Sequence, residues 1–250
     1  MKKIATDFII NQYQSGVENY ATFTTEIGLW ASEEYVFTKY LSKTDKILDL
    51  GCGTGRTTFP LYQLGYQQII GVDLTPEMIE KAIALNDSYQ AEIDFIEGDA
   101  KNLKFEDNCF DAVIFSFNGL MSIPELSQRK IVVKEINRVL KPTGLFLFTT
   151  HDRDKEAQYF DFWRKQRKIW DQGKQDEKLH EFGDLITVSK NEISEIFIHI
   201  PNQEEVEQLL RGEGFKVIET FYRSDKFQEN EKVKEKSGEC RFWIAQKVYL

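Results

Sequence analysis

The chain has 250 residues, of which 41% are hydrophobic and 29% are charged, with only 5 Pro and 15 Gly. This composition is typical of a globular protein and excludes collagen-like, coiled-coil and disordered chains. The formal net charge is −9. An acidic total disfavours a protein that tracks a nucleic-acid backbone, although a local basic patch can lie within it.

The few cysteines and histidines indicate no metal centre. The cysteines form no CxxC pair, and the histidines lie far apart along the chain, so we predict neither a metal site nor disulfides, as suits a reducing compartment. The start of the chain is too short and polar for a signal peptide. Because no apolar run approaches the roughly 18 residues of a membrane span, we expect a cytoplasmic protein.

The first half of the chain alternates between helical and strand-like segments. Residues 1–45 are predicted to be helical and carry many aromatic side chains, among them Tyr13, Tyr20 and Trp30. Five apolar runs follow, and because they are continuous rather than alternating they predict buried strands: Lys46–Leu50, Gln68–Val72, Ile93–Ile96, Asp111–Phe117 and Leu145–Thr149. Helical segments lie between them, one of them capped by Thr75 and another running from about Pro124 to Leu140. Such alternation predicts a mostly parallel sheet with helices on both faces.

The alternation is interrupted after Thr150. Residues 151–180 favour an amphipathic helix, and two strand-like runs around Lys190-Asn191 favour a hairpin, so residues 151–200 form a predicted insertion. The regular pattern then resumes with a helix capped by Asn202 and with the strands Phe215–Phe221 and Arg241–Val248, which flank a charged segment.

One feature of the insertion resembles a nucleic-acid patch. The basic run Arg164–Lys168 lies between Trp163 and Trp170, and basic groups interleaved with rings can bind single strands. The neighbouring acidic residues favour the other interpretation, a solvated helix face.

The motif with the clearest chemistry is a glycine loop. A buried strand runs into Gly51-x-Gly53-x-Gly55, and a helix follows. Glycines at such a turn allow a tight bend and let a ligand lie against backbone N–H groups. The dinucleotide fingerprint is GxGxxG, whereas here Arg56 occupies the sixth place, so the spacing suits a ligand without a pyrophosphate. A purely structural turn is the alternative.

Two aspartates follow the next two strands. Asp73 ends the second strand, where a carboxylate can accept hydrogen bonds from ribose hydroxyls, and Asp99 follows the third, where it can accept from an exocyclic amine such as that of adenine. Each charge-assisted hydrogen bond is worth about 1.5–3 kcal/mol. Either residue alone can be an ordinary turn aspartate, but together, in register beside the glycine loop, they indicate a nucleoside site.

These residues make the chain resemble the class I S-adenosylmethionine-dependent methyltransferases, in particular the small-molecule branch that includes enzymes of quinone biosynthesis. The resemblance covers about residues 40–150 and rests on ILDLGCGTGR (47–56), GVDLTPEMIEKA (71–82), IEGDAKNLKF (96–105), FDAVIFSFNGLMSI (110–123) and EINRVLKPTGLFLF (135–148). It implies a Rossmann-like seven-stranded, mostly parallel sheet whose last strand is antiparallel, with residues 46–250 as the methyltransferase domain. Residues 1–45 would then form an N-terminal helical lid, and the insertion at 151–200 a substrate cap.

The resemblance also implies a role for particular residues toward S-adenosylmethionine. The methionine end would be held by Asp49, Gly51, Gly53 and Gly55. Asp73 would take the ribose hydroxyls, and the adenine would meet Leu74, Met78, Asp99 and Ala100. The sulfonium and the acceptor would face Ser116, Phe117 and Asn118.

The predicted function is methyl transfer from S-adenosylmethionine to a small-molecule acceptor, with S-adenosylhomocysteine as product. Because the methyl group is already activated, a general base is needed only when the acceptor must lose a proton, and His151, just after the fifth strand, is the candidate. Three alternatives remain: a methyltransferase acting on RNA or protein, a non-catalytic nucleotide-binding module, and an NAD-dependent dehydrogenase, which the glycine spacing disfavours. The acceptor and the oligomeric state cannot be read from the sequence.

Overall fold

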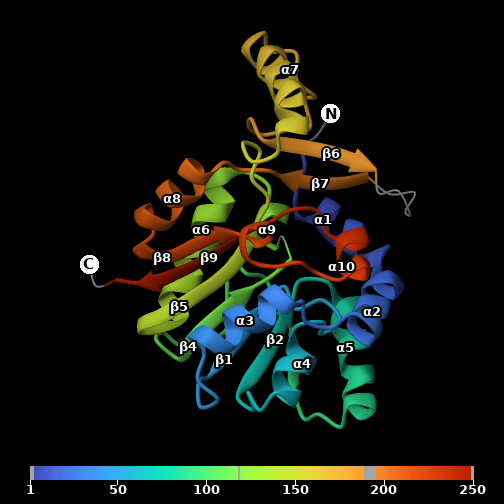
Figure 1. Ribbon diagram of the computed structural model, residues 1–250, viewed down its shortest axis with the longest axis vertical. Helices are drawn as coiled ribbons and strands as arrows, with labels where there is room; N and C mark the ends of the chain where they lie inside the picture. The colour runs from blue at the N-terminus through green and yellow to red at the C-terminus, as the bar shows by residue number, and fades with distance from the viewer. Residues whose placement is uncertain (1–2, 118, 189–194, 249–250) are drawn as a thin grey trace.

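A sheet of seven strands forms the centre of the molecule (Figure 1). The computed structural model describes residues 3–117, 119–188 and 195–248. The strands of the sheet are β1 (Ile47–Leu50), β2 (Ile69–Asp73), β3 (Asp94–Glu97), β4 (Phe110–Phe115), β5 (Leu140–Thr150), β8 (Phe215–Tyr222) and β9 (Arg241–Lys247). Their order is β3-β2-β1-β4-β5-β9-β8, and β9 is antiparallel to both of its neighbours, whereas the pairs among β1 to β5 are parallel. The predicted sheet with an antiparallel last strand is confirmed.

Alternate residues of the strands face two different helical layers. Leu48 and Leu50 pack with the layer of α6 (Leu126–Val139) and α8 (Gln203–Gly212), whereas Ile47 packs with that of α3 (Ala31–Tyr40) and α4 (Thr58–Gln63). Helix α5 (Pro76–Tyr89) contacts β2 and β3. Because side chains alternate along a strand, Asp49 lies on the same side as Ile47. Its side chain therefore faces α4.

The strand order of the sheet reverses beside β1. Strand β1 pairs with β2 on one side and with β4 on the other, so successive crossovers leave in opposite directions there. In open sheets of this kind, ligands bind in the crevice outside the carboxyl ends of the strands at such a point. The fold thus brings the ends of β1, β2, β3 and β4 to one place.

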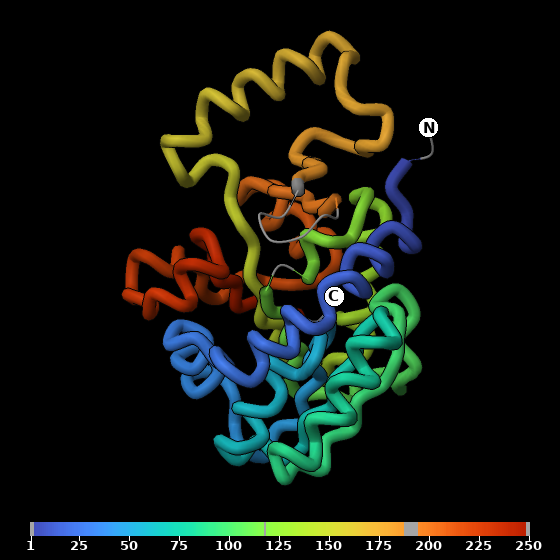
Figure 2. Tube along the Cα trace, turned by 90° about the vertical axis from the view of Figure 1, so that its right-hand side faces the viewer, coloured from blue at the N-terminus to red at the C-terminus, as the bar shows by residue number. Residues whose placement is uncertain are grey.

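Residues 151–200 form a layer at one end of the long axis of the molecule (Figures 1 and 2). They contain the short helix η2 (Ala157–Tyr159), α7 (Phe160–Asp171) and an antiparallel pair, β6 (Asp184–Val188) with β7 (Glu195–His199). The turn predicted at Lys190-Asn191 lies outside the described residues. The pair is tied to the main domain, since Arg153 donates to both carboxylate oxygens of Glu205 in α8, at 2.7 and 2.5 Å.

The layer also contains a cluster of side chains of the metal-ligand type. The spacing of the histidines in the sequence did not predict it. Ligand-type atoms of Glu181, Asp184 and His199 lie within 4.8 Å of one another. Each side chain already has protein partners: Asp184 bonds to His199 Nδ1 at 2.8 Å and accepts two backbone N–H groups, while Glu181 accepts from Arg129 at 2.8 Å. These contacts hold the layer against α6.

The N-terminal helices join this layer to the sheet. Helix α1 (Thr6–Gln14) contacts both β7 and α5, and α2 (Val17–Glu26) contacts α5. The side chain of Gln12 accepts the backbone N–H of Phe197 in β7 at 2.9 Å. None of the described helices is long and apolar enough to cross a bilayer.

One predicted helix cap needs correction. Thr75 is the N-cap residue of α5, but its side chain makes no cap hydrogen bond, because it bonds to the Asp73 carboxylate instead. The same carboxylate also accepts the Thr75 backbone N–H at 2.9 Å. The charged segment between the last two strands is partly helical. It contains the short helices α9 (Arg223–Lys226) and α10 (Glu231–Lys236), and Val233 of α10 is buried against the sheet layer that contains Phe242.

Candidate functional site

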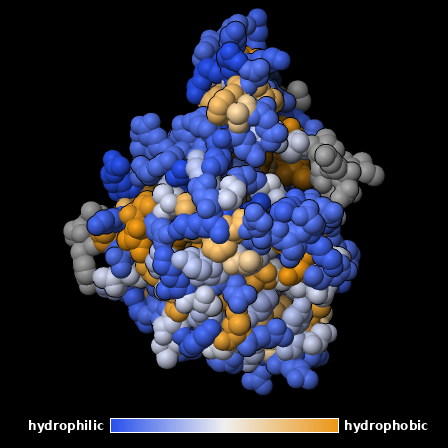
Figure 3. All heavy atoms as spheres, viewed as in Figure 1, coloured by the Kyte–Doolittle hydropathy of each residue, from blue (hydrophilic) through white to orange (hydrophobic). Residues whose placement is uncertain are grey.

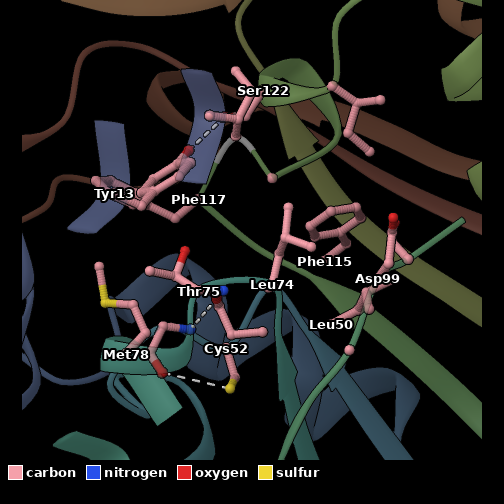
Figure 4. A pocket seen from close by; sticks show the side chains of 18 of the residues that line it. Tyr13, Leu50, Cys52, Leu74, Thr75, Met78, Asp99, Phe115, Phe117 and Ser122 are labelled. Atoms are coloured by element: carbon pink, nitrogen blue, oxygen red, sulfur yellow. Dashed lines mark hydrogen bonds between the residues drawn. The ribbon is translucent and has the colours of Figure 1, made fainter. Parts of the chain in front are cut away.

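A cavity opens at the carboxyl ends of the first four strands (Figure 4). Its empty volume, including the open solvent at its mouth, is about 1150 Å³. The walls come from the loops after β1 to β4, from α1 and α2, and from residues 119–128.

The glycine loop after β1 forms one wall of the cavity. Gly51 has φ +66° and a Cβ there would lie 2.7 Å from the ring of Phe115, so the close approach requires glycine. A Cβ at Gly53 would meet only the Met78 sulfur, at 4.0 Å. The loop therefore leaves open space above Gly53, where a ligand can lie against the backbone.

Asp73 links the ends of β1 and β2. Its carboxylate accepts the Gly53 backbone N–H at 2.8 Å through one oxygen and the Thr75 N–H at 2.9 Å through the other. Burial raises the pKa of Asp73, and these backbone hydrogen bonds oppose the rise. Asp73 lines the cavity, so its carboxylate oxygens are acceptors on the wall between the glycine loop and the end of β2.

Two residues of the predicted cofactor set do not reach the cavity wall. Asp49 is only 1% exposed and accepts the Thr58 hydroxyl at 2.7 Å, and burial raises its pKa to about 7. Gly55 lies under the loop, where a Cβ would come within 2.6 Å of the Phe59 ring. Both positions support the loop from behind rather than facing the cavity.

Asp99 and its neighbours form the wall that β3 contributes. Asp99 accepts the Lys101 backbone N–H at 2.9 Å, and the Lys101 ammonium lies 3.5 Å from the other carboxylate oxygen. The same ammonium donates to the Thr6 hydroxyl of α1 at 3.1 Å. Ala100 lines the cavity beside Asp99, and Leu74 after β2 provides apolar surface nearby.

Phe117, just after β4, has an unusual backbone conformation. Its φ is +50°, a backbone conformation that is unfavourable for a bulky residue and marks functional or tightly packed positions. The ring has edge-on partners on α2 and at the start of α3: Tyr20 at 6.4 Å, Phe23 at 6.5 Å and Trp30 at 5.4 Å between centroids. Together with Ser116, Phe117 lines the cavity just after β4.

A buried ion pair lies next to the Phe117 ring. Both terminal nitrogens of Arg56 donate to Glu33 at 2.7 Å, and Arg56 also donates to the Gly28 carbonyl at 2.9 Å. The guanidinium lies 5.4 Å from the Phe117 ring centroid and 4.9 Å from that of Trp30. The charge of Arg56 is thus neutralised within the protein, although the residue lines the cavity.

A hydrogen bond joins two opposing elements above the cavity. The hydroxyls of Tyr13 in α1 and Ser122 in the short helix η1 (Gly119–Ser122) are 2.5 Å apart. Figure 4 shows this pair on the side of the cavity opposite Met78 and Cys52. Burial raises the pKa of Tyr13 to about 12, so its hydroxyl stays protonated.

The structure places His151 elsewhere. It is not among the residues that line the cavity. Its Nδ1 lies 2.6 Å from the Glu239 carbonyl, which can only accept, so Nδ1 carries the proton. Burial lowers the pKa of the ring.

The cavity thus brings together most of the predicted cofactor residues, namely Gly51, Gly53, Asp73, Leu74, Met78, Asp99, Ala100, Ser116 and Phe117. Asn118 lies outside the described residues. The sequence did not identify Ser122, Thr6 or Lys101, because their positions depend on how α1 and η1 pack across the cavity. For Arg56, the sequence pattern indicates only a departure from the dinucleotide spacing and predicts no role in the site.

Comparisons with known proteins identify the family. Residues 47–144 match a family described as a methyltransferase domain. A demethylmenaquinone methyltransferase of Staphylococcus saprophyticus is 30% identical over 175 residues, covering 68% of this chain and 70% of the relative. The chain belongs to the class I S-adenosylmethionine-dependent methyltransferases.

Further relatives agree with this assignment. A demethylmenaquinone methyltransferase of Staphylococcus haemolyticus is 29% identical over 178 residues, covering 69% of each chain. Among solved structures, a methyltransferase of Methanosarcina mazei superposes on this one with a TM-score of 0.70 at 22% identity, covering 90% of this chain and all of the other, which supports the fold. Family membership makes this methyltransferase an enzyme and removes the dehydrogenase alternative.

The cavity of this methyltransferase fits the cofactor that the family uses. S-adenosylmethionine offers ribose hydroxyls and an adenine amine as donors, and the cavity offers the carboxylates of Asp73 and Asp99 as acceptors. The open space above Gly53 accommodates a ligand pressed against the loop. The ring face of Phe117 is electron-rich, which suits a nearby sulfonium cation.

Proposed function

We propose that this methyltransferase transfers the methyl group of S-adenosylmethionine to a small-molecule acceptor. In this proposal Asp73 holds the ribose hydroxyls, and Asp99 with Ala100 meets the adenine edge. The loop at Gly51 and Gly53 accommodates the methionine end. Hydrogen-bond lengths, burial and the open space described above support each of these placements.

The observation that carries the choice of a small acceptor is the Tyr13–Ser122 hydrogen bond. It connects α1 to η1 on the side of the cavity opposite Met78, so an acceptor must fit between this bridge and the cofactor. A base within a folded RNA or a side chain on a protein surface would have to displace α1. The lining beside the bridge is largely aromatic and apolar, with Tyr20 and Ile9 among its residues, and the demethylmenaquinone relatives named above are consistent with an apolar acceptor.

The protein's contribution to the reaction is alignment. The bound cofactor supplies a methyl group already activated by a sulfonium charge. The rigid position of Phe117 and the closure by Tyr13 orient the acceptor in line with that methyl group and exclude water, effects that lower a barrier by several kcal/mol. Because His151 is not among the residues that line the cavity and its Nδ1–H donates to a backbone carbonyl, its predicted role as a base finds no support in the geometry. A His151→Ala enzyme with unchanged turnover would exclude it.

Methyl transfer from labelled cofactor tests the proposal. The enzyme is incubated with a metabolite extract, with total RNA and with a protein fraction in parallel. We expect label in organic-soluble small molecules, and much less of it with a Tyr13→Phe/Ser122→Ala variant whose S-adenosylhomocysteine affinity is retained. Label in the RNA or protein fraction would contradict the proposal in favour of a macromolecular acceptor. Absence of transfer into the small-molecule fraction, despite cofactor binding, would contradict the proposed class of acceptor.

A further inference from the structure

Helix α7 has features that methyl transfer does not require. It is the outermost element at one end of the long axis and projects from the main domain (Figures 1 and 2). Four basic residues occupy five consecutive positions of this helix, Arg164, Lys165, Arg167 and Lys168, in a chain whose net charge is −9. A local positive surface on an acidic protein indicates an acidic partner.

The structure shows which rings of this region are free to contact a partner. Trp163 is only 8% exposed, and both Trp163 and Trp170 pack edge-on against Phe182. The two tryptophans therefore anchor α7 to the insertion and do not form an open stacking platform. The guanidinium of Arg167 lies 3.4 Å from the centroid of the Phe182 ring and strengthens this anchor.

The exposed rings are those that precede and begin the helix. Tyr159, Phe160 and Phe162 are 50%, 48% and 39% exposed. Figure 3 shows apolar surface at the base of α7, surrounded by hydrophilic atoms. Three neighbouring exposed aromatic residues are unusual for a surface in water, and such patches mark interaction sites.

The cations beside these rings differ in their availability. Arg164 pairs with Asp161, and Arg167 lies over Phe182. Lys165 and Lys168 make no ion pair with any of residues 3–117, 119–188 and 195–248, and both are exposed. Exposed lysines and exposed rings on one segment suit an anionic lipid surface, which attracts the lysines by charge and accepts amphipathic or apolar side chains in its headgroup region.

We propose that α7 and the preceding ring cluster dock on the surface of an anionic lipid membrane. Tyr159, Phe160 and Phe162 enter the headgroup region, while Lys165 and Lys168 interact with the lipid charges. Helix α7 projects at one end of the molecule, where a flat surface can reach it. Nucleic acid fits less well, because the two tryptophans that would stack on bases are packed internally. The proposal is independent of the identity of the methyl acceptor.

Co-sedimentation of the full chain with vesicles tests the proposal. Phosphatidylcholine vesicles with and without phosphatidylglycerol are compared at low and moderate salt. We expect binding that requires the anionic lipid and weakens with salt, since each basic residue near such a surface contributes by attraction that is screened. Lys165→Glu/Lys168→Glu should weaken vesicle binding by about ten-fold or more, and Phe160→Ser/Phe162→Ser by about ten-fold or more.

Matched variants on other helices provide the controls. Lys130→Glu/Lys134→Glu on α6 makes the same charge change at exposed positions, and Ile83→Ser on α5 removes a side chain that is 52% exposed. Both controls should bind vesicles like the wild type, and every variant should keep its S-adenosylhomocysteine affinity. The proposal is overturned if no vesicle binds the protein, if the α7 variants bind vesicles as the wild type does, or if the lysine variants instead abolish binding to total tRNA.

Discussion

Replacement of Asp73 by Ala is expected to weaken cofactor binding strongly. In the proposed site this carboxylate accepts the ribose hydroxyls in addition to the backbone N–H groups of Gly53 and Thr75, at 2.8 and 2.9 Å. One charge-assisted hydrogen bond is worth about 1.5–3 kcal/mol, which corresponds to about 12- to 160-fold in Kd. The variant also leaves the backbone N–H groups of Gly53 and Thr75 without their acceptor. The 12-fold loss of affinity is therefore a minimum.

Isothermal titration with S-adenosylhomocysteine measures this effect. Asp73→Asn retains one acceptor oxygen and should lose less affinity than Asp73→Ala. Asp94→Ala is the matched control, because Asp94 is an exposed aspartate at the opposite end of the neighbouring strand β3, and its affinity should equal that of the wild type. An Asp73→Ala protein that is folded and binds with wild-type affinity would refute the ribose assignment.

Three further predictions concern groups around the cavity. The pKa of Asp49 rises on folding from its ordinary 3.8 to about 7, so the wild type loses up to about 4 kcal/mol of unfolding free energy as the pH rises from 4 through 7. Urea unfolding at pH 5 and pH 8 should show a smaller loss in Asp49→Asn, and an equal loss would contradict the buried carboxyl. Arg56→Met leaves Glu33 buried without its partner and should lower the free energy of unfolding by about 3–5 kcal/mol. Arg56→Met/Glu33→Met should regain most of that loss in the same unfolding assay. A double variant as unstable as the single one would argue against the importance of the ion pair. Gly51→Ala adds a Cβ 2.7 Å from the Phe115 ring at φ +66°, so it should lower the melting temperature and weaken S-adenosylhomocysteine binding, and an unchanged affinity would show that the loop can adapt.

The sheet and the cofactor wall were predictable because they depend on local sequence patterns. Continuous apolar runs identify buried strands, and parallel strands place their carboxyl ends at one edge. Asp73 and Asp99 follow two such strands directly, so their convergence on the cavity follows from strand order. The confirmed antiparallel position of β9 was an implication of the family resemblance.

Other parts of the site depend on contacts between segments far apart in the chain. Tyr13 and Ser122 meet only because α1 packs against β7 and α5, and no local pattern encodes that packing. The glycine-loop motif also did not predict the orientation of the Asp49 side chain. Strand alternation places Asp49 on the α4 side of β1, and the Thr58 hydroxyl then holds it there.

The measurement that tests the central claim most directly is a crystal structure of the enzyme with S-adenosylhomocysteine. We predict the adenosyl group at the carboxyl ends of β1 to β3, with its ribose hydroxyls on Asp73, its adenine beside Asp99 and its sulfur directed toward Phe117 and Tyr13. Density for the ligand at another place, or a ribose that makes no contact with Asp73, would contradict the account.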